Sequence, residues 1–100
     1  MSNSPEVSSR LVVQSLGGLL ELPDDEREVL LDTLAAFLAS DGSPTRAADE
    51  LFCHRNTVMH RLRRIESVTG RKLTDPRSRL LWQLALLGTE HRRPAQRRSA

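Results

Sequence analysis

Apolar residues recur along this chain at the three- and four-residue spacing of amphipathic helices, and no run shows the alternation typical of strands. The pattern therefore predicts an all-α domain, a helix-turn-helix fold with about five helices. A glycine pair at 17–18 weakens the C-terminal end of the first predicted helix, because each glycine destabilises a helix by roughly 1 kcal/mol. We expect the first helix over residues 9–16 or slightly beyond. The second should open within residues 23–26 and stop at 41–42, and the others are expected over 44–51, 55–69 and 76–87.

Cap and turn residues mark the ends of these helices. Asp25 with Glu28 three residues later resembles a capping box, and acidic residues favour the positive end of a helix. Gly42 suits the left-handed position that closes a helix. The other start and stop signals are Ser43 followed by Pro44, His54 as an N-cap, Gly70, Asp75 followed by Pro76, and Gly88.

The segment 47–65 carries the most specific pattern. It predicts two short helices joined by a tight turn, with small alanines where the helices cross. The second helix turns basic and polar side chains outward, as a recognition helix facing DNA does. The residues expected to point inward are Ala48, Leu51, Cys53, Val58, Leu62 and Ile65.

The turn itself holds one conflict. Phe52 stands where many helix-turn-helix turns have a glycine with positive φ. Phenylalanine in that conformation would be strained, so the sequence predicts a turn that is longer or differently shaped. Cys53 beside it has core packing as its default role. Cys53, His54 and His60 lack zinc-like spacing and a second cysteine pair, so no metal site is expected.

Residue chemistry divides the outward side chains into two sets. Arginine can bind guanine and asparagine can bind adenine through two hydrogen bonds, and methionine can pack on a thymine methyl group. Contacts to phosphates fix register without carrying sequence information directly. The expected base-contacting residues are Arg55, Asn56, Met59, His60 and Arg63, and the expected phosphate-contacting residues are Thr45, Arg46, Thr57, Arg61, Arg64, Arg71 and Lys72.

Several of these residues have structural alternatives. Arg61 follows Val58 by three positions, so a stem packed inward with a head paired to Glu50 or Asp49 is as well supported as a phosphate contact. His54 is favoured as a helix cap over a base contact. Asn56 is also able to satisfy backbone groups in the first turn of its helix.

Charge is divided along the chain. Residues 21–50 hold nine acids and two arginines, a balance of −7, whereas residues 51–100 hold twelve bases and three acids, a balance of +9. A basic face of this kind is typical of a polyanion binder. The single cysteine and the absence of a signal peptide or a membrane span favour a cytoplasmic protein. No cofactor motif and no grouping of catalytic residues appears, so we do not expect an enzyme.

Length and composition predict one domain with three parts. Residues 1–22 are expected to be the end of an upstream linker or a short helix, 23–88 the DNA-binding domain, and 89–100 a basic disordered tail. The segment 80–87 is apolar nearly all round, so it needs cover on more than one side. That cover is either the segment 11–22 or a second subunit, and we expect a homodimer.

From residue 31 to 87 the chain resembles the C-terminal helix-turn-helix domain of PucR-type transcriptional regulators, which include purine-catabolism and sugar-diacid regulators. The specific part is His-Arg-Asn-Thr at 54–57 followed by Arg-Leu-Arg-Arg-Ile at 61–65. The resemblance implies a regulator that binds duplex DNA. Family members are several times longer, so the chain is expected to be an excised domain or a short paralogue.

One departure limits what the resemblance carries over. Family members often have Leu-Arg-Tyr after the His-Arg-Asn-Thr, where this chain has Val58, Met59 and His60. If those positions face the groove, the operator sequence does not transfer. A rival hypothesis is a helical protein-interaction or dimerisation module whose basic face meets an acidic protein.

Overall fold

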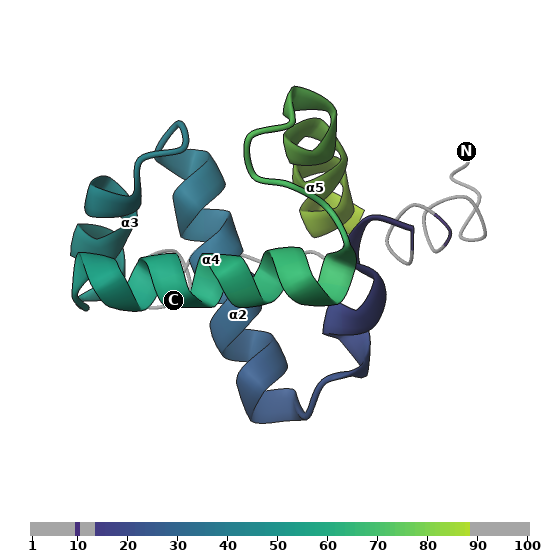
Figure 1. The fold of residues 1–100 in the computed structure, drawn as a ribbon, viewed down its shortest axis with the longest axis horizontal. Coiled ribbons are helices and arrows are strands. Elements are labelled where there is room, and N and C mark those ends of the chain that lie inside the picture. The colour runs from purple at the N-terminus through teal and green to yellow at the C-terminus, as the bar shows by residue number, and fades with distance from the viewer. Residues whose placement is uncertain (1–9, 11–13, 89–100) are drawn as a thin grey trace.

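The computed structural model describes residue 10 and residues 14–88. Within these residues the chain is helical and contains no strand. Figure 1 shows α4 crossing in front of α2, with α3 beside the N-terminal end of α4 and α5 near its C-terminal end. The elements are a 3-10 helix η1 (Gly17–Glu21) and the α-helices α2 (Asp24–Ala39), α3 (Pro44–Leu51), α4 (Arg55–Thr69) and α5 (Pro76–Gly88).

The ends of α2 differ from the sequence expectation. The helix begins at Asp24 after Pro23 with no side-chain cap, so the predicted capping box of Asp25 and Glu28 is wrong. Three acids in its first turn still complement the positive end of the helix. At the other end Gly42 is left-handed as predicted, with φ of 79°, but Asp41 before it is left-handed too, with φ of 55°. The amide of Gly42 then donates to the Phe37 carbonyl at 3.0 Å, which closes a Schellman motif.

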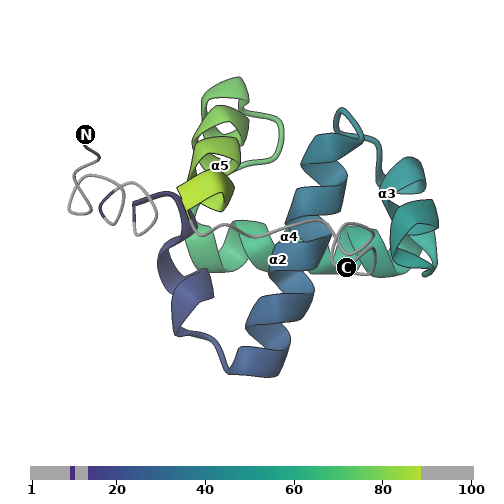
Figure 2. The same ribbon diagram turned by 180° about the vertical axis from the view of Figure 1, so that it is seen from behind.

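The predicted boundaries of α3 and α4 are confirmed. Ser43 Oγ accepts from the Arg46 amide at 3.2 Å, and Pro44 occupies the first position of α3. Gly70 ends α4 in the left-handed region, with φ of 73°. Seen from behind in Figure 2, α2 lies across α4, and the core sits where α2, α3 and α4 meet.

Residues 14–22 pack into the same core as the helices that follow. Leu16 and Leu19 are fully buried. The buried indole N–H of Trp82 donates to the Ser15 carbonyl at 3.0 Å, which ties this segment to α5 across 67 positions of sequence. One side of α5, whose segment 80–87 is apolar nearly all round, therefore packs against the N-terminal segment. Of the first helix expected at 9–16, residues 9 and 11–13 lie outside the described residues.

Two polar groups set the position of α5. Asp75 caps it, since one carboxylate oxygen accepts from the Arg77 amide at 3.3 Å and the other from the Ser78 hydroxyl at 2.8 Å. The Ser78 hydrogen bond in particular lowers the pKa of Asp75. Arg79 donates to the Leu73 carbonyl at 2.6 Å, and its guanidinium lies 5.5 Å from the centre of the Phe37 ring, against α2.

The contact between η1 and α4 makes a testable prediction. A Cβ atom at Gly18 would lie 2.7 Å from the Val68 carbonyl oxygen, a backbone atom that cannot turn away. We therefore expect Gly18→Ala to lower the free energy of unfolding by about 1–3 kcal/mol, as measured by urea denaturation. Gly88→Ala, at the exposed end of α5, is the matched control and should lose no stability. Wild-type stability in Gly18→Ala would contradict this contact.

Candidate nucleic-acid interface

The turn between α3 and α4 has the compact geometry that glycine usually provides. Phe52 adopts the left-handed conformation itself, with φ of 57° and ψ of 44°, so the predicted longer or differently shaped turn is wrong. The Phe52 amide donates to the Asp49 carbonyl at 3.3 Å, and the Cys53 amide donates to the Ala48 carbonyl at 3.1 Å. These bonds close α3, and the side chain of Phe52 remains 76% exposed.

His54 begins the second helix of the motif, and its role as an N-cap is confirmed. Its Nδ1 atom accepts from the Asn56 amide at 3.0 Å, which places the ring proton on Nε2 in the neutral form. Cys53, half-buried, packs against the core as predicted. With the cap supplied by His54, the exposed side chain of Asn56 is not needed for that purpose.

The two faces of α4 separate as the pattern predicts. Val58, Leu62 and Ile65 are fully buried, and their spacing of four and three residues puts them on one side of the helix. The opposite side therefore points away from the core. It carries the exposed residues Asn56, His60, Arg63 and Ser67, again four, three and four positions apart.

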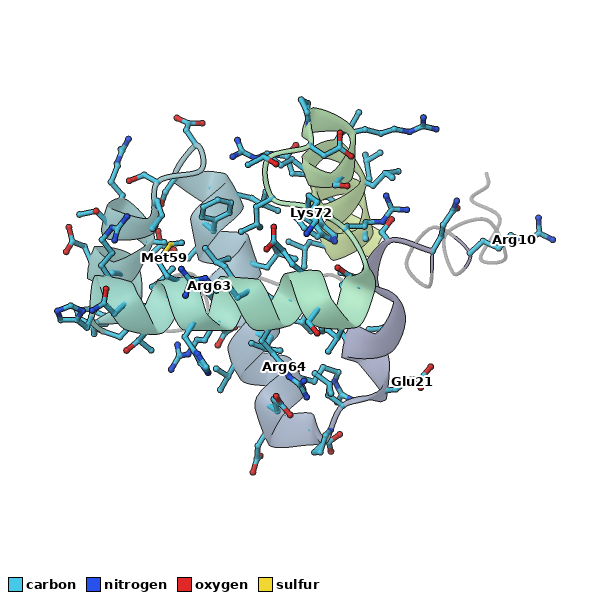
Figure 3. All side chains as sticks on the ribbon, in the orientation of Figure 1. Arg10, Glu21, Met59, Arg63, Arg64 and Lys72 are labelled. Atoms are coloured by element: carbon cyan, nitrogen blue, oxygen red, sulfur yellow. The ribbon has the colours of Figure 1, made fainter. Side chains whose placement is uncertain are left out.

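The structure brings most of the base-contacting candidates together. Asn56, His60 and Arg63 share the exposed face, and Arg55 is exposed at the first position of the helix. Met59 lies at the edge of that face, half-buried against the core on the side of α3, as Figure 3 shows. Of the residues at which the chain departs from Leu-Arg-Tyr, only His60 is exposed, because Val58 is buried. Ser67 lies on the same face. Its spacing of four residues from Arg63 predicts this position, although Ser67 is not among the residues expected from the sequence.

The phosphate candidates lie around this face rather than in one cluster. Figure 3 shows Lys72 on one side of α4 and Arg64 on the other. Arg71 donates through Nη2 to the Gln14 carbonyl at 3.3 Å, so part of its role is to hold the N-terminal segment. Lys72 is exposed in the loop after α4, and Thr57 is half-buried in its first turn.

Arg61 and Arg64 turn toward α2. The Arg61 guanidinium donates to the Thr33 hydroxyl at 3.5 Å, and that of Arg64 donates to the Glu26 carboxylate at 3.0 Å. Together with His60 they line a surface groove of about 400 Å³, whose α2 side is Asp25, Glu26, Val29 and Leu30. Glu26 is a residue that sequence reasoning missed, because it lies 38 positions from Arg64 and only the packing of α2 on α4 brings them together.

At the N-terminus of α3, Thr45 and Arg46 are both exposed. The amide of Arg46 is already bonded to Ser43, so a phosphate there would meet the side chains of these two residues. Among the described residues, no group of three or more histidine, cysteine, aspartate or glutamate side chains is placed to hold a metal ion. The described helices also include none with the length and apolar content needed to cross a bilayer.

Comparison with known proteins gives one family. Residues 30–88 match the family model of the PucR C-terminal helix-turn-helix domain. No solved structure matches the chain with statistical significance.

Three relatives represent the matches among curated proteins. The chain is 38% identical over 61 residues to the purine catabolism regulatory protein of Bacillus subtilis (strain 168), which covers 61% of the chain and 12% of that protein. It is 40% identical over 68 residues to the carbohydrate diacid regulator of Escherichia coli (strain K12), and the match covers 68% of the chain and 18% of that protein. It is also 40% identical over 78 residues to an uncharacterised protein of Thermomonospora curvata, and the match covers 78% of the chain and 43% of that protein. The chain thus spans less than half the length of each of these relatives.

The left-handed Phe52 makes a second prediction. Phe52→Gly and Phe52→Ala both remove the exposed ring, but only glycine adopts this backbone conformation without steric strain. We expect the glycine variant to be more stable than the alanine variant by about 1 kcal/mol in urea denaturation. Equal stability of the two variants would mean that the turn stores no strain at this residue.

Proposed function

The chain belongs to the PucR C-terminal helix-turn-helix family, and we propose that it binds duplex DNA sequence-specifically as the DNA-binding domain of a bacterial transcriptional regulator. The observation that carries the proposal is the exposed polar face of α4, which lies opposite the buried stripe of Val58, Leu62 and Ile65. The relatives named as regulators support it. We assign the chain no catalytic role and place its action in the cytoplasm.

In this proposal the first turns of α4 enter the major groove, which admits a helix. Arg55 and Asn56 lie at the start of the helix and His60 and Arg63 follow on the same face, so these four are the main base contacts. Arginine suits the O6 and N7 atoms of guanine, and asparagine suits the N6 and N7 atoms of adenine. Met59 has a smaller part, because much of its side chain is packed against the core.

Phosphate contacts on both sides of the groove would fix the register of α4. Thr45 and Arg46 would hold one strand beside α3, and Arg71 and Lys72 would hold the backbone beyond the C-terminal end of α4. Thr57, Arg61 and Arg64 lie on the flank toward α2. Arg64 must exchange its ion pair with Glu26 for a phosphate, and this exchange is cheap because the pair is about half exposed and worth no more than about 1 kcal/mol.

We further propose that the protein acts on DNA as a homodimer, because one short recognition helix contacts only a few base pairs. Two copies related by a two-fold axis bind like half-sites about 34 Å apart or a multiple of that distance. The rival function, a module that docks an acidic protein, shares the basic face. It does not require the hydrogen-bonding residues Asn56 and His60 to lie in the middle of that face.

Salt dependence provides the direct test of DNA binding. We expect a fluorescence-anisotropy titration with duplex DNA to show log affinity falling linearly with log salt concentration, with a slope of about −0.9 per phosphate neutralised. A folded chain that retains no duplex even at low salt would contradict the proposed function and favour the protein-docking alternative.

Substitutions separate base contacts from phosphate contacts. Using sequences selected from a random duplex pool, Arg55→Ala or Asn56→Ala should weaken specific binding by roughly 1–3 kcal/mol and relax the preference at one base pair. Lys72→Ala should weaken all sequences alike and flatten the salt slope by about one unit.

Arg27→Ala is the matched control for these substitutions, since it removes the same charge from α2, where Arg27 pairs with Asp24 at 2.9 Å. It should leave base preference unchanged. If Arg55→Ala weakened selected and random duplexes equally, Arg55 would be a phosphate contact instead of a base contact.

A further inference from the structure

The outer face of α5 carries a row of apolar side chains that the core does not use. Leu80, Leu84 and Leu87 are 55%, 42% and 75% exposed, and their spacing of four and three residues places them on one side of the helix. Arg77, also exposed, extends the same row by three residues toward the N-terminus. These four residues are called the α5 stripe below.

The orientation of this stripe is fixed by what lies behind it. The inner face of α5 buries Ser78, Trp82, Ala85 and Leu86. The hydrogen bond from the Trp82 indole to the Ser15 carbonyl and that from Arg79 to the Leu73 carbonyl hold the helix against rotation. The leucines cannot turn inward without breaking these contacts, so the stripe is a stable outward surface.

We propose that the α5 stripe binds the α5 stripe of a second copy of this chain, with the two helices antiparallel across a two-fold axis. The proposal rests on the proposed function, for which it names the dimer interface. With the axis between Leu80 and Leu84, Leu80 of each copy packs on Leu84 of the other. A row of like residues centred in this way is complementary to itself, as a two-fold interface requires.

Charge selects the antiparallel arrangement. The C-terminal end of α5 carries the negative pole of the helix, and no basic residue lies in its last turn. Antiparallel pairing brings Arg77 of the second copy to this end, beside Leu87. Parallel pairing would instead set the two Arg77 guanidinium groups against each other.

The composition of residues 89–100 and the small exposed area of the α5 stripe further limit what can bind to it. Residues 89–100 contain four arginines and no leucine, isoleucine, valine or phenylalanine, so their chemistry does not match an apolar stripe. Three partly exposed leucines offer far less than the ~800 Å² per partner of a stable interface. The dimer is therefore weak: it forms in solution at high protein concentration, and more readily when two copies are held on one duplex, where their effective concentration is high.

The position of α5 is compatible with this arrangement. Figures 1 and 2 show α5 and the N-terminal turn of α2 on opposite sides of α4. A second copy on α5 therefore adds to the side of α4 and leaves its exposed face open.

Paired charge variants of the full chain test the interface directly. One variant carries Leu80→Glu with Leu84→Glu, and the other carries Leu80→Lys with Leu84→Lys. Sedimentation equilibrium without DNA should show concentration-dependent dimers for the wild type and monomers for each variant alone. An equimolar mixture should dimerise again, because each glutamate then faces a lysine. Gln83→Glu, exposed on the flank of the stripe, is the control and should associate as the wild type does.

The outcomes distinguish the interface from the function. The proposed interface would be overturned by a wild type that stays monomeric at all concentrations or by a mixture that does not associate. Variants that dimerise alone would also overturn it, because the contact would then lie elsewhere. Circular dichroism verifies that the variants are folded. The selected duplex is titrated with the same proteins in parallel. Variants that bind the duplex as single copies leave the proposed function intact. A wild type that self-associates but binds no duplex supports the interface and contradicts the proposed function.

Discussion

Burial of one side of α4 is the constraint on which the rest of the structure depends. Val58, Leu62 and Ile65 are fully removed from water, so the helix cannot rotate without exposing them. Because side chains on a helix repeat every three to four residues, fixing the inner face also fixes the outer one. The polar face of Asn56, His60 and Arg63 is thus held in position by the apolar contacts on the opposite side of the helix.

The elements around α4 reinforce this orientation from several directions. Residues 14–22 pack against its C-terminal half, where Gly18 approaches the Val68 carbonyl too closely to carry a side chain. The indole of Trp82 then joins the same segment to α5. At the opposite end the tight turn at Phe52 keeps α3 close to the first turn of α4. In this domain, which has only three aromatic residues, these backbone contacts add to the packing of the core.

The division of charge along the chain has a spatial counterpart. Three acids of α2, Asp24, Asp25 and Glu26, lie in its first turn, where Glu26 meets Arg64. Arg63 and Lys72 lie on the other side of α4 from Arg64 (Figure 3). The basic surface is therefore asymmetric about the recognition helix. If α4 binds DNA as proposed, the phosphate backbone is attracted more strongly on the side of Arg63 and Lys72.

The sequence by itself determined the helices, their caps at Ser43, His54 and Asp75, and the inner face of α4, because these depend on local spacing and on hydrogen bonds between near neighbours. Local patterns failed at the Asp25–Glu28 capping box and at Phe52, where the closure of α3 imposes a conformation that phenylalanine disfavours. Only the tertiary structure decided that Glu26 holds Arg64, that Arg71 holds residue 14, and that Leu80, Leu84 and Leu87 face outward. Each of these depends on how distant segments pack, and no periodicity within one helix records the position of another.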